Sequence, residues 1–208
     1  LAITLIEIIP DDYGYTTLIP GFGFLPDLFP EPYIANWKLN SFEAVSDQLP
    51  GVRIPMNSFM GSVGVLPGKA EVAKWLARES QLGAAGGVAL PPEPTGASPA
   101  SVCGPNGSHK TECLRTVPPR ENGGNMDVKQ MVKGTTLLLP CFIDGCGFFI
   151  GDVHFAQGDG EVAGTAIETG AVVTVTTEIR KGMASLIKQP MFEGGSQIKS
   201  LQPDRFHA

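Results

Sequence analysis

Glycine and proline limit what this chain can fold into. It contains 26 glycines and 18 prolines among 208 residues, roughly a fifth of the chain, where about 12% is average. Glycine costs a helix interior about 1 kcal/mol and proline about 3 kcal/mol, so an all-helical bundle is excluded. Hydrophobic residues still make up 42% of the chain, enough to bury a core. We therefore expect a mainly β, β-rich α+β fold with a few short helices, built as a multi-sheet sandwich or barrel-like architecture.

The net charge of the chain limits the kinds of partner that it can bind. The net charge is −6, and no run of lysine and arginine exceeds two residues. Nucleic acids and anionic membranes both require a basic surface, so neither is an expected partner. No apolar run reaches the roughly 18 residues of a membrane span, and the start lacks the features of a signal peptide. We expect a cytoplasmic protein.

The pattern along the chain predicts three parts. Residues 1–90 form a β-rich part with one helix, over Ala70 to Ala84. Residues 91–120 are rich in proline, glycine and serine and form a linker or wrapping segment. Residues 121–208 form a second β-rich part, with Asp144-Gly145 as the turn of a hairpin between 135–142 and 148–150. The chain opens inside a strand and ends without a closing element, so we expect a fragment of a larger chain.

The first strand is expected to end at Pro10. Asp11 to Pro32 then has neither helical nor strand periodicity, and it carries several aromatic residues between glycines and prolines. Long loops of this kind are often binding lids, although an aromatic-anchored loop packed on its own core has the same pattern.

The four cysteines match neither a zinc ribbon nor a redox motif. Cys141 lies in an apolar run, where cysteine commonly acts as a small hydrophobic residue. We expect reduced, structural thiols, with a Cys103–Cys113 disulfide as the leading exception.

Polar residues with catalytic potential concentrate between residues 122 and 161. Side chains two apart on a strand share a face, so Asp152 and His154 should project together, as should Asp159 and Glu161. One imidazole and several carboxylates suit a hard or borderline divalent metal, with a spare carboxylate as general base. Oxygen-rich loops with glycine also suit structural calcium. An ordinary hairpin turn and a lone structural histidine would have the same sequence. Composition alone therefore does not decide whether these residues form a functional site.

Several blocks of the sequence resemble those of a known protein family. Residues 151–161, GDVHFAQGDGE, resemble the signature stretch of the acetamidase/formamidase family. The resemblance continues through 166–168 (AIE) and is supported upstream by 122–127 (NGGNMD), 61–67 (GSVGVLP) and 90–92 (LPP). These blocks occur in the order and approximate spacing of the family, from about Val52 to Ile179.

The resemblance implies hydrolysis of formamide or acetamide to a carboxylate and ammonia, in a β-rich homo-oligomer holding a divalent metal, with zinc the first choice and calcium the second. It implies Asp127, His154 and Asp152 as metal ligands and Glu161 as general base. It further implies supporting roles for four residues, with Asp159 orienting Glu161 or sharing the metal, Asn125 and Gln157 binding the amide, and Glu168 supporting the ligands.

This chain departs from the family pattern in two ways, and two alternatives to formamide or acetamide hydrolysis stay open. Family members are about twice this long, and polar residues near their N-terminus, histidine included, are expected to complete the site. A non-catalytic β-rich binding or subunit module with a structural metal loop is the alternative from another class. The same site could also hydrolyse a different amide, including a cyclic one. The sequence does not separate formamide from acetamide, because one methyl group is worth only about 1–3 kcal/mol.

Overall fold

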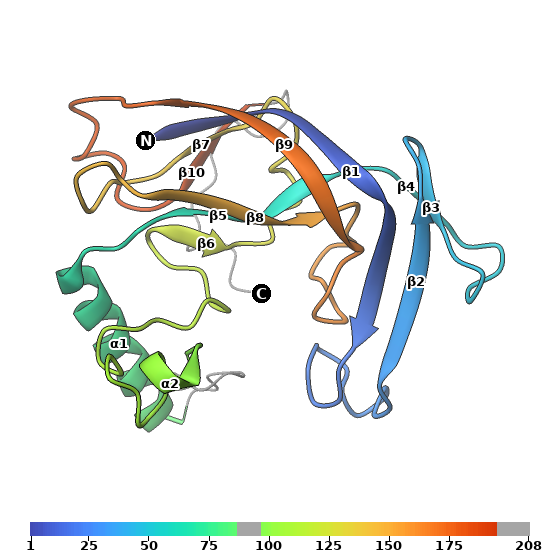
Figure 1. Cartoon of the computed structure of the whole chain (residues 1–208), viewed down its shortest axis with the longest axis horizontal. Coiled ribbons are helices and arrows are strands. Elements are labelled where there is room, and N and C mark those ends of the chain that lie inside the picture. Colours follow the sequence, from blue (N-terminus) through green and yellow to red (C-terminus); the bar gives the residue numbers. More distant parts are fainter. Residues whose placement is uncertain (87–96, 195–208) are drawn as a thin grey trace.

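The computed structural model describes residues 1–86 and 97–194, and it is mainly β (Figure 1). The predicted fold class is confirmed. The strands are β1 (Ala2–Leu18), β2 (Tyr33–Leu39), β3 (Glu43–Val45), β4 (Arg53–Pro55), β5 (Phe59–Val65), β6 (Gly123–Asn125), β7 (Thr136–Leu138), β8 (Phe148–His154), β9 (Glu168–Glu178) and β10 (Met191–Glu193). The helices are α1 (Lys69–Ala84), close to its predicted bounds, and α2 (Ala100–Cys103).

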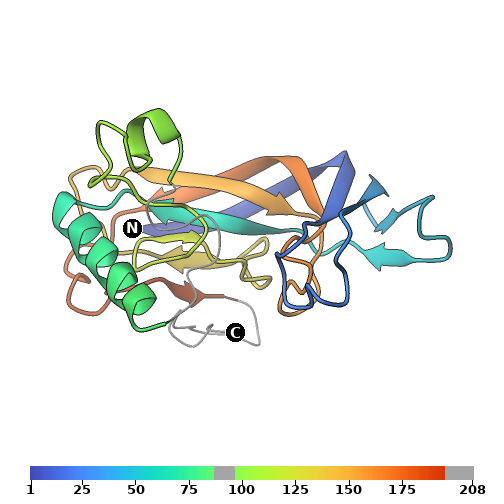
Figure 2. The same ribbon diagram turned by 90° about the horizontal axis from the view of Figure 1, so that it is seen from below.

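The described strands join in one antiparallel sheet instead of several. Its main order is β4-β3-β2-β1-β9-β8-β5-β6, and β7 pairs with both β1 and β10, so the sheet divides at β1. Strands from the predicted parts 1–90 and 121–208 are interleaved in it, and the division into these parts stays a prediction. Figure 2 shows α1 at the opposite end of the molecule from β3 and β4. No helix in the described ranges is both long enough and apolar enough to cross a membrane.

The prediction that the first strand ends at Pro10 is wrong. β1 continues to Leu18, and its second half pairs with β2 from Tyr13↔Lys38 to Leu18↔Tyr33. The register of β1 against β9 shifts between Leu5 and Glu7 and again between Pro10 and Gly14. These irregularities accommodate proline within a strand, because a bulge leaves a residue out of the hydrogen-bond ladder. Only residues 19–32 of the expected loop are a connection, and they link β1 to β2.

The predicted hairpin is also wrong, although its turn is present. The Cys146 N–H donates to the Ile143 carbonyl at 3.0 Å, which places Asp144-Gly145 at the tip of a turn. The strands on either side then separate, since β7 pairs with β1 and β10 while β8 pairs with β5 and β9. A turn motif determines only the local bend of the chain. Long-range pairing with buried strands determines which strand each neighbour of the turn pairs with.

The cysteines are paired in the structure, which corrects the expectation of reduced thiols. Cys103–Cys113 forms, as the exception anticipated, and Cys141–Cys146 forms as well. The turn at residues 143–146 brings the second pair within 4.7 Å between Cα atoms, close enough for a disulfide. The apolar neighbours of Cys141 suggested burial, but Cys141 is exposed.

The main core lies under the centre of the sheet. Ile3 and Leu5 of β1 pack with Met60, Val63 and Val65 of β5, together with the apolar residues of β7 and the loop before it. A smaller cluster surrounds Trp37 and Phe155 under the β2–β3 end of the sheet. The two clusters flank the end of β8, because Val153 packs in the main core and Phe155 in the smaller cluster.

Helix α1 is attached through one aromatic and one ionic contact. Trp75 is buried and meets Phe142 edge to face, with ring centroids 5.8 Å apart. One turn further on, Glu79 accepts from Arg120 Nε at 2.7 Å, and its other oxygen lies 3.4 Å from Arg115 Nε. All three side chains are more than nine-tenths buried. The ion cluster therefore joins α1 to the segment that leads into β6.

This cluster predicts a large stability effect. Breaking a buried ion pair by removing one partner typically costs about 3–5 kcal/mol, because a charge is left buried without compensation. Glu79→Gln should therefore lower the free energy of unfolding by about 3 kcal/mol in urea denaturation. Glu112→Gln, which removes an exposed carboxylate 4.0 Å from Lys69, is the matched control and should change it by less than about 1 kcal/mol. Equal effects of the two variants would contradict the assignment.

Candidate active site

The site is centred on His154, the last residue of β8. The imidazole is 1% exposed and meets the Phe59 ring edge to face, with centroids 4.8 Å apart. The register of the sheet explains this position, because His154 pairs with Phe59 of β5 on one side and with Glu168 of β9 on the other. The side chain therefore lies where three long strands meet.

Three carboxylates from separate elements face the same ring nitrogen. His154 Nε2 is 3.2 Å from Glu168 Oε2, 3.3 Å from Asp152 Oδ1 and 3.9 Å from Asp127 Oδ1. The predicted pairing of Asp152 with His154 is thus found in the structure. Asp127 follows β6, and Glu168 begins β9, so the sheet brings together residues 41 positions apart.

Glu161 completes the cluster from the loop before β9. Its carboxylate, with Asp127 and His154, forms a group whose ligand atoms all lie within 4.8 Å of one another. Asp152, His154 and Glu168 form a second such group. Both groups share His154, so one imidazole and four carboxylates surround a common volume.

Three of the four carboxylates require unusual backbone. Asp127, Asp152 and Glu161 have φ of 49°, 61° and 43°. Of the described residues, Cys146 is the one further non-glycine residue with positive φ. Such conformations cost of order 1–3 kcal/mol each and cluster at functional sites, where the surroundings hold them in place. The strain therefore falls on the residues that aim carboxylates at His154.

Hydrogen bonds hold these side chains in position. Ser62 Oγ lies 3.1 Å from Asp152 Oδ2 and equally far from Asn125 Oδ1, so its single proton serves one acceptor at a time. Asn125 Nδ2 donates to the Val117 carbonyl at 3.0 Å. The Ala166 N–H donates to Glu168 Oε1 at 2.9 Å, which leaves the other oxygen of Glu168 facing His154.

Burial and the contacts within the cluster shift the pKa values of its members. Burial, and then the charge of Glu161, raise the pKa of Asp127 to about 7. Burial also raises the pKa of Glu161. Burial alone would lower the pKa of His154, but hydrogen bonds to Asp152 and Glu168 outweigh it and raise the pKa to about 10. The hydrogen bond to His154 in turn lowers the pKa of Asp152. The cluster therefore has a strong electrostatic preference for added positive charge.

The cluster opens into a pocket of about 450 Å³. Two threonines join its walls, because the Thr17 N–H donates to Thr165 Oγ1 at 2.9 Å, and Thr165 Oγ1 donates to the Thr17 carbonyl at 3.0 Å. The residues lining the pocket are Tyr15, Thr17, Ile19, Asn125, Asp127, Asp152, His154, Glu161, Gly164, Thr165 and Glu168.

Two of the predicted site residues do not line this pocket. Asp159 is exposed and lies 2.6 Å from Lys129 Nζ, because residues 158–164 form turns instead of the strand that would align it with Glu161. Gln157 lies beside Glu161 and favours the ionised form of its carboxyl without offsetting the effect of burial, and its Nε2 is buried with no partner within hydrogen-bond distance. The roles assigned to both residues stay predictions.

Tyr15, Thr17 and Ile19 form a wall of the pocket. They lie in the stretch expected to be a loop with a possible lid role, but Tyr15 and Thr17 belong to β1 and Ile19 follows it. Pairing of Tyr15 with Glu168 of β9 brings this end of β1 to the site. Gly61 was also missed as a site residue, although the block around it was noticed. A Cβ there would lie 2.5 Å from Asp152 Oδ2 and 2.9 Å from Asp127 Oδ1. Only glycine leaves room for both carboxylates.

The donor set fits a divalent metal. Imidazole nitrogen and carboxylate oxygens are ligands of zinc, while calcium prefers oxygen alone. Burial, and then the neighbouring carboxylates, raise the pKa of Asp127 and of Glu161, and a bound cation opposes both effects by favouring the ionised form. Asp127, Asp152, His154, Glu161 and Glu168 are the residues that could hold it.

Comparison with known proteins identifies the family of this chain. The profile of the acetamidase/formamidase family matches residues 1–207, and the chain belongs to that family. It is 36% identical over 185 residues to an acetamidase of Mycolicibacterium smegmatis, covering 83% of this chain and 45% of the relative. It is 35% identical over 184 residues to a formamidase of Methylophilus methylotrophus, again covering 83% and 45%. The chain thus spans about half the length of the curated relatives it matches.

Solved structures show the same fold. A gamma lactamase from Delftia acidovorans superposes with a TM-score of 0.80 at 33% identity, covering 95% of this chain and 52% of that one. An acetamidase from Bacillus halodurans superposes with a TM-score of 0.67 over 93% of this chain and 50% of that one, and at 23% identity it supports the fold alone.

Gly61 provides a test of the site geometry. Gly61→Ala should lower the free energy of unfolding by about 1–3 kcal/mol, as is usual for overpacking, because the new methyl group displaces Asp152 and Asp127. Chemical denaturation measures it. Gly151→Ala on the neighbouring strand is the matched control, since a Cβ there meets no atom within 4 Å. If both variants are equally stable, the close approach at Gly61 is wrong.

Proposed function

We propose that this chain carries the site of an amidohydrolase that converts short aliphatic amides, formamide or acetamide, to a carboxylate and ammonia. The observation that carries the proposal is the convergence of Asp127, Asp152, Glu161 and Glu168 on the buried His154. The names of the relatives, acetamidase and formamidase, support the substrate class. Cytoplasmic location and homo-oligomeric assembly belong to the same proposal, from composition and from the family resemblance.

Asp127, His154 and Asp152 are proposed as metal ligands, with Glu168 supporting His154. Zinc is the first choice because the set contains imidazole, and calcium is the second because oxygen dominates. A divalent ion here would polarise the amide carbonyl and make water more acidic.

Glu161 is the proposed general base. Burial raises the pKa of its carboxyl, and a base works best when its pKa approaches the working pH. Glu161 takes a proton from water as the water oxygen forms a bond to the amide carbon. The same proton then passes to the nitrogen, the carbon–nitrogen bond breaks, and ammonia leaves with the carboxylic acid as the other product. The acid then gives its remaining proton to ammonia or to solvent, which yields the carboxylate, so each proton is accounted for without an added reactant.

The remaining predicted residues bind and orient. Asn125 lines the pocket and uses one N–H of its amide on Val117, so its second N–H is the proposed donor to the substrate oxygen. Gln157 has a buried amide nitrogen without a partner, a donor that the substrate or the developing oxyanion could use. Asp159 is proposed to position the loop of Glu161 through its ion pair with Lys129.

The general-base role predicts a selective loss of activity. Glu161→Gln should lower kcat for acetamide or formamide by about 10²–10⁴-fold, the usual contribution of a general base, because an amide does not accept the proton. Ammonia release measures it, and the thermal unfolding midpoint should not fall. Asp144→Asn, at an exposed turn whose residues do not line the pocket, is the control. Turnover of Glu161→Gln close to that of Asp144→Asn would refute the role.

The metal proposal has its own measurement. The purified chain should contain a stoichiometric divalent ion by elemental mass spectrometry, and His154→Asn should reduce that content because it removes the shared ligand. Chelation should abolish ammonia release, and zinc should restore it. Hydrolysis that survives complete chelation would rule out a metal-dependent reaction. Bound calcium without any hydrolysis would instead favour the non-catalytic binding module.

A further inference from the structure

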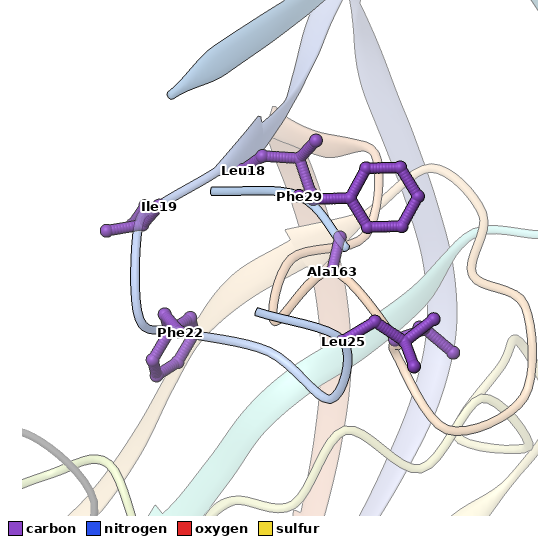
Figure 3. Close-up of a pocket in the computed structure, with 7 residues that line it drawn as sticks. Leu18, Ile19, Phe22, Leu25, Phe29 and Ala163 are labelled. Atoms are coloured by element: carbon purple, nitrogen blue, oxygen red, sulfur yellow. The ribbon is translucent and has the colours of Figure 1, made fainter. Parts of the chain in front are cut away.

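A second pocket, of about 230 Å³, lies beside the acidic one and is lined entirely by hydrocarbon side chains. Ile19, Phe22, Leu25 and Phe29 come from the β1–β2 connection, where the sequence pattern suggested a binding lid. Residues 162–163 of the Glu161 loop form the opposite wall, as Figure 3 shows for Ala163.

The two walls are fixed to each other. The Phe24 N–H donates to the Val162 carbonyl at 3.0 Å. The loops approach so closely at two glycines that a side chain would not fit. A Cβ on Gly23 would lie 2.8 Å from the Val162 carbonyl oxygen, and a Cβ on Gly164 would overlap the Phe22 ring. The apolar pocket is therefore a built part of the site loop.

This pocket adjoins the acidic one. Ile19 lines both pockets. Glu161 and Gly164 line the acidic pocket, and the two residues between them line the apolar pocket. A molecule whose amide group lies at His154 can therefore extend past Ile19 into hydrocarbon surroundings.

We propose that the apolar pocket is an acyl-chain subsite, which takes the hydrocarbon chain of a primary amide of four to six carbons. This rests on the proposed amide hydrolysis. Size supports it, because a cavity of about 150 Å³ lined by similar residues holds benzene, so one of 230 Å³ accommodates a butyl or pentyl chain. Formamide and acetamide leave it empty. Ile19, Leu25 and Phe29 are 52%, 44% and 52% exposed, and a bound chain would cover this surface.

A series of primary amides tests the subsite. Burying one methylene favours binding enough to raise kcat/KM about fourfold, so kcat/KM should rise by about that factor per methylene from acetamide through butanamide to hexanamide. A flat or falling series would overturn the subsite.

A variant pair localises the effect. Leu25→Asn should lower the ratio of kcat/KM for hexanamide to that for acetamide at least tenfold, because it places an amide in the hydrocarbon wall. Leu28→Asn is the matched control in the same loop, since Leu28 is 70% exposed and does not line the pocket. Its ratio should equal that of the unmodified chain. Equal ratios in all three proteins would overturn the proposal.

Binding measured without turnover separates this proposal from the hydrolytic one. In methyl NMR, hexanamide should shift the resonances of Leu25 and Ala163, and acetamide should leave them in place. These shifts without release of ammonia would refute the proposed hydrolysis and support the subsite. Ammonia release from acetamide without these shifts would support hydrolysis and overturn the subsite. Loss of an oligomer in Leu25→Asn, with the substrate ratio unchanged, would also overturn it, in favour of an interface between copies.

Discussion

The structure depends on holding four carboxylates around one buried imidazole. Burial of the carboxylates is costly, and repulsion between like charges this close adds to the cost, so the pKa of Asp127 and that of Glu161 are both raised. The cluster persists because separate rigid elements supply its members. Asp152 and His154 come from β8, Glu168 comes from the paired strand β9, and the remaining two come from tight turns. A site of this kind cannot relax by moving one strand, since each strand is paired on both sides.

One of the many glycines has a specific structural role at this site. Thirteen of the described glycines have positive φ, which other residues rarely adopt, whereas Gly61 is required because there is no space for a side chain in the middle of β5. Its carbonyl accepts the N–H groups of Met126 and Asp127, and the space above it holds the carboxylates of Asp127 and Asp152. One residue without a side chain therefore sets both the backbone path after β6 and the distance between two acids.

Sequence reasoning predicted the features that depend on local backbone geometry and on the sequence motifs of the family. Asp152 and His154 meet because a strand places alternate residues on one face, and this holds even with positive φ at Asp152. The same rule failed for Asp159 and Glu161, because the glycines around them make turns. The continuation of β1 beyond Pro10 was not predicted either. Its pairing with β9 is long-range, and an irregularity in the register between Pro10 and Gly14 accommodates the proline within the strand. Local patterns therefore located the residues, and sheet register decided which of them meet.

The acidic and apolar pockets depend on the same loop. Residues 161–164 carry Glu161 towards His154 and at the same time place residues 162–163 against the β1–β2 connection. The threonine contacts between Thr17 and Thr165 close this loop onto β1. Packing on the apolar side therefore holds the loop that places Glu161 on the polar side. Since burial is the main cause of the raised pKa of Glu161, this packing also contributes to the demand of the cluster for a cation.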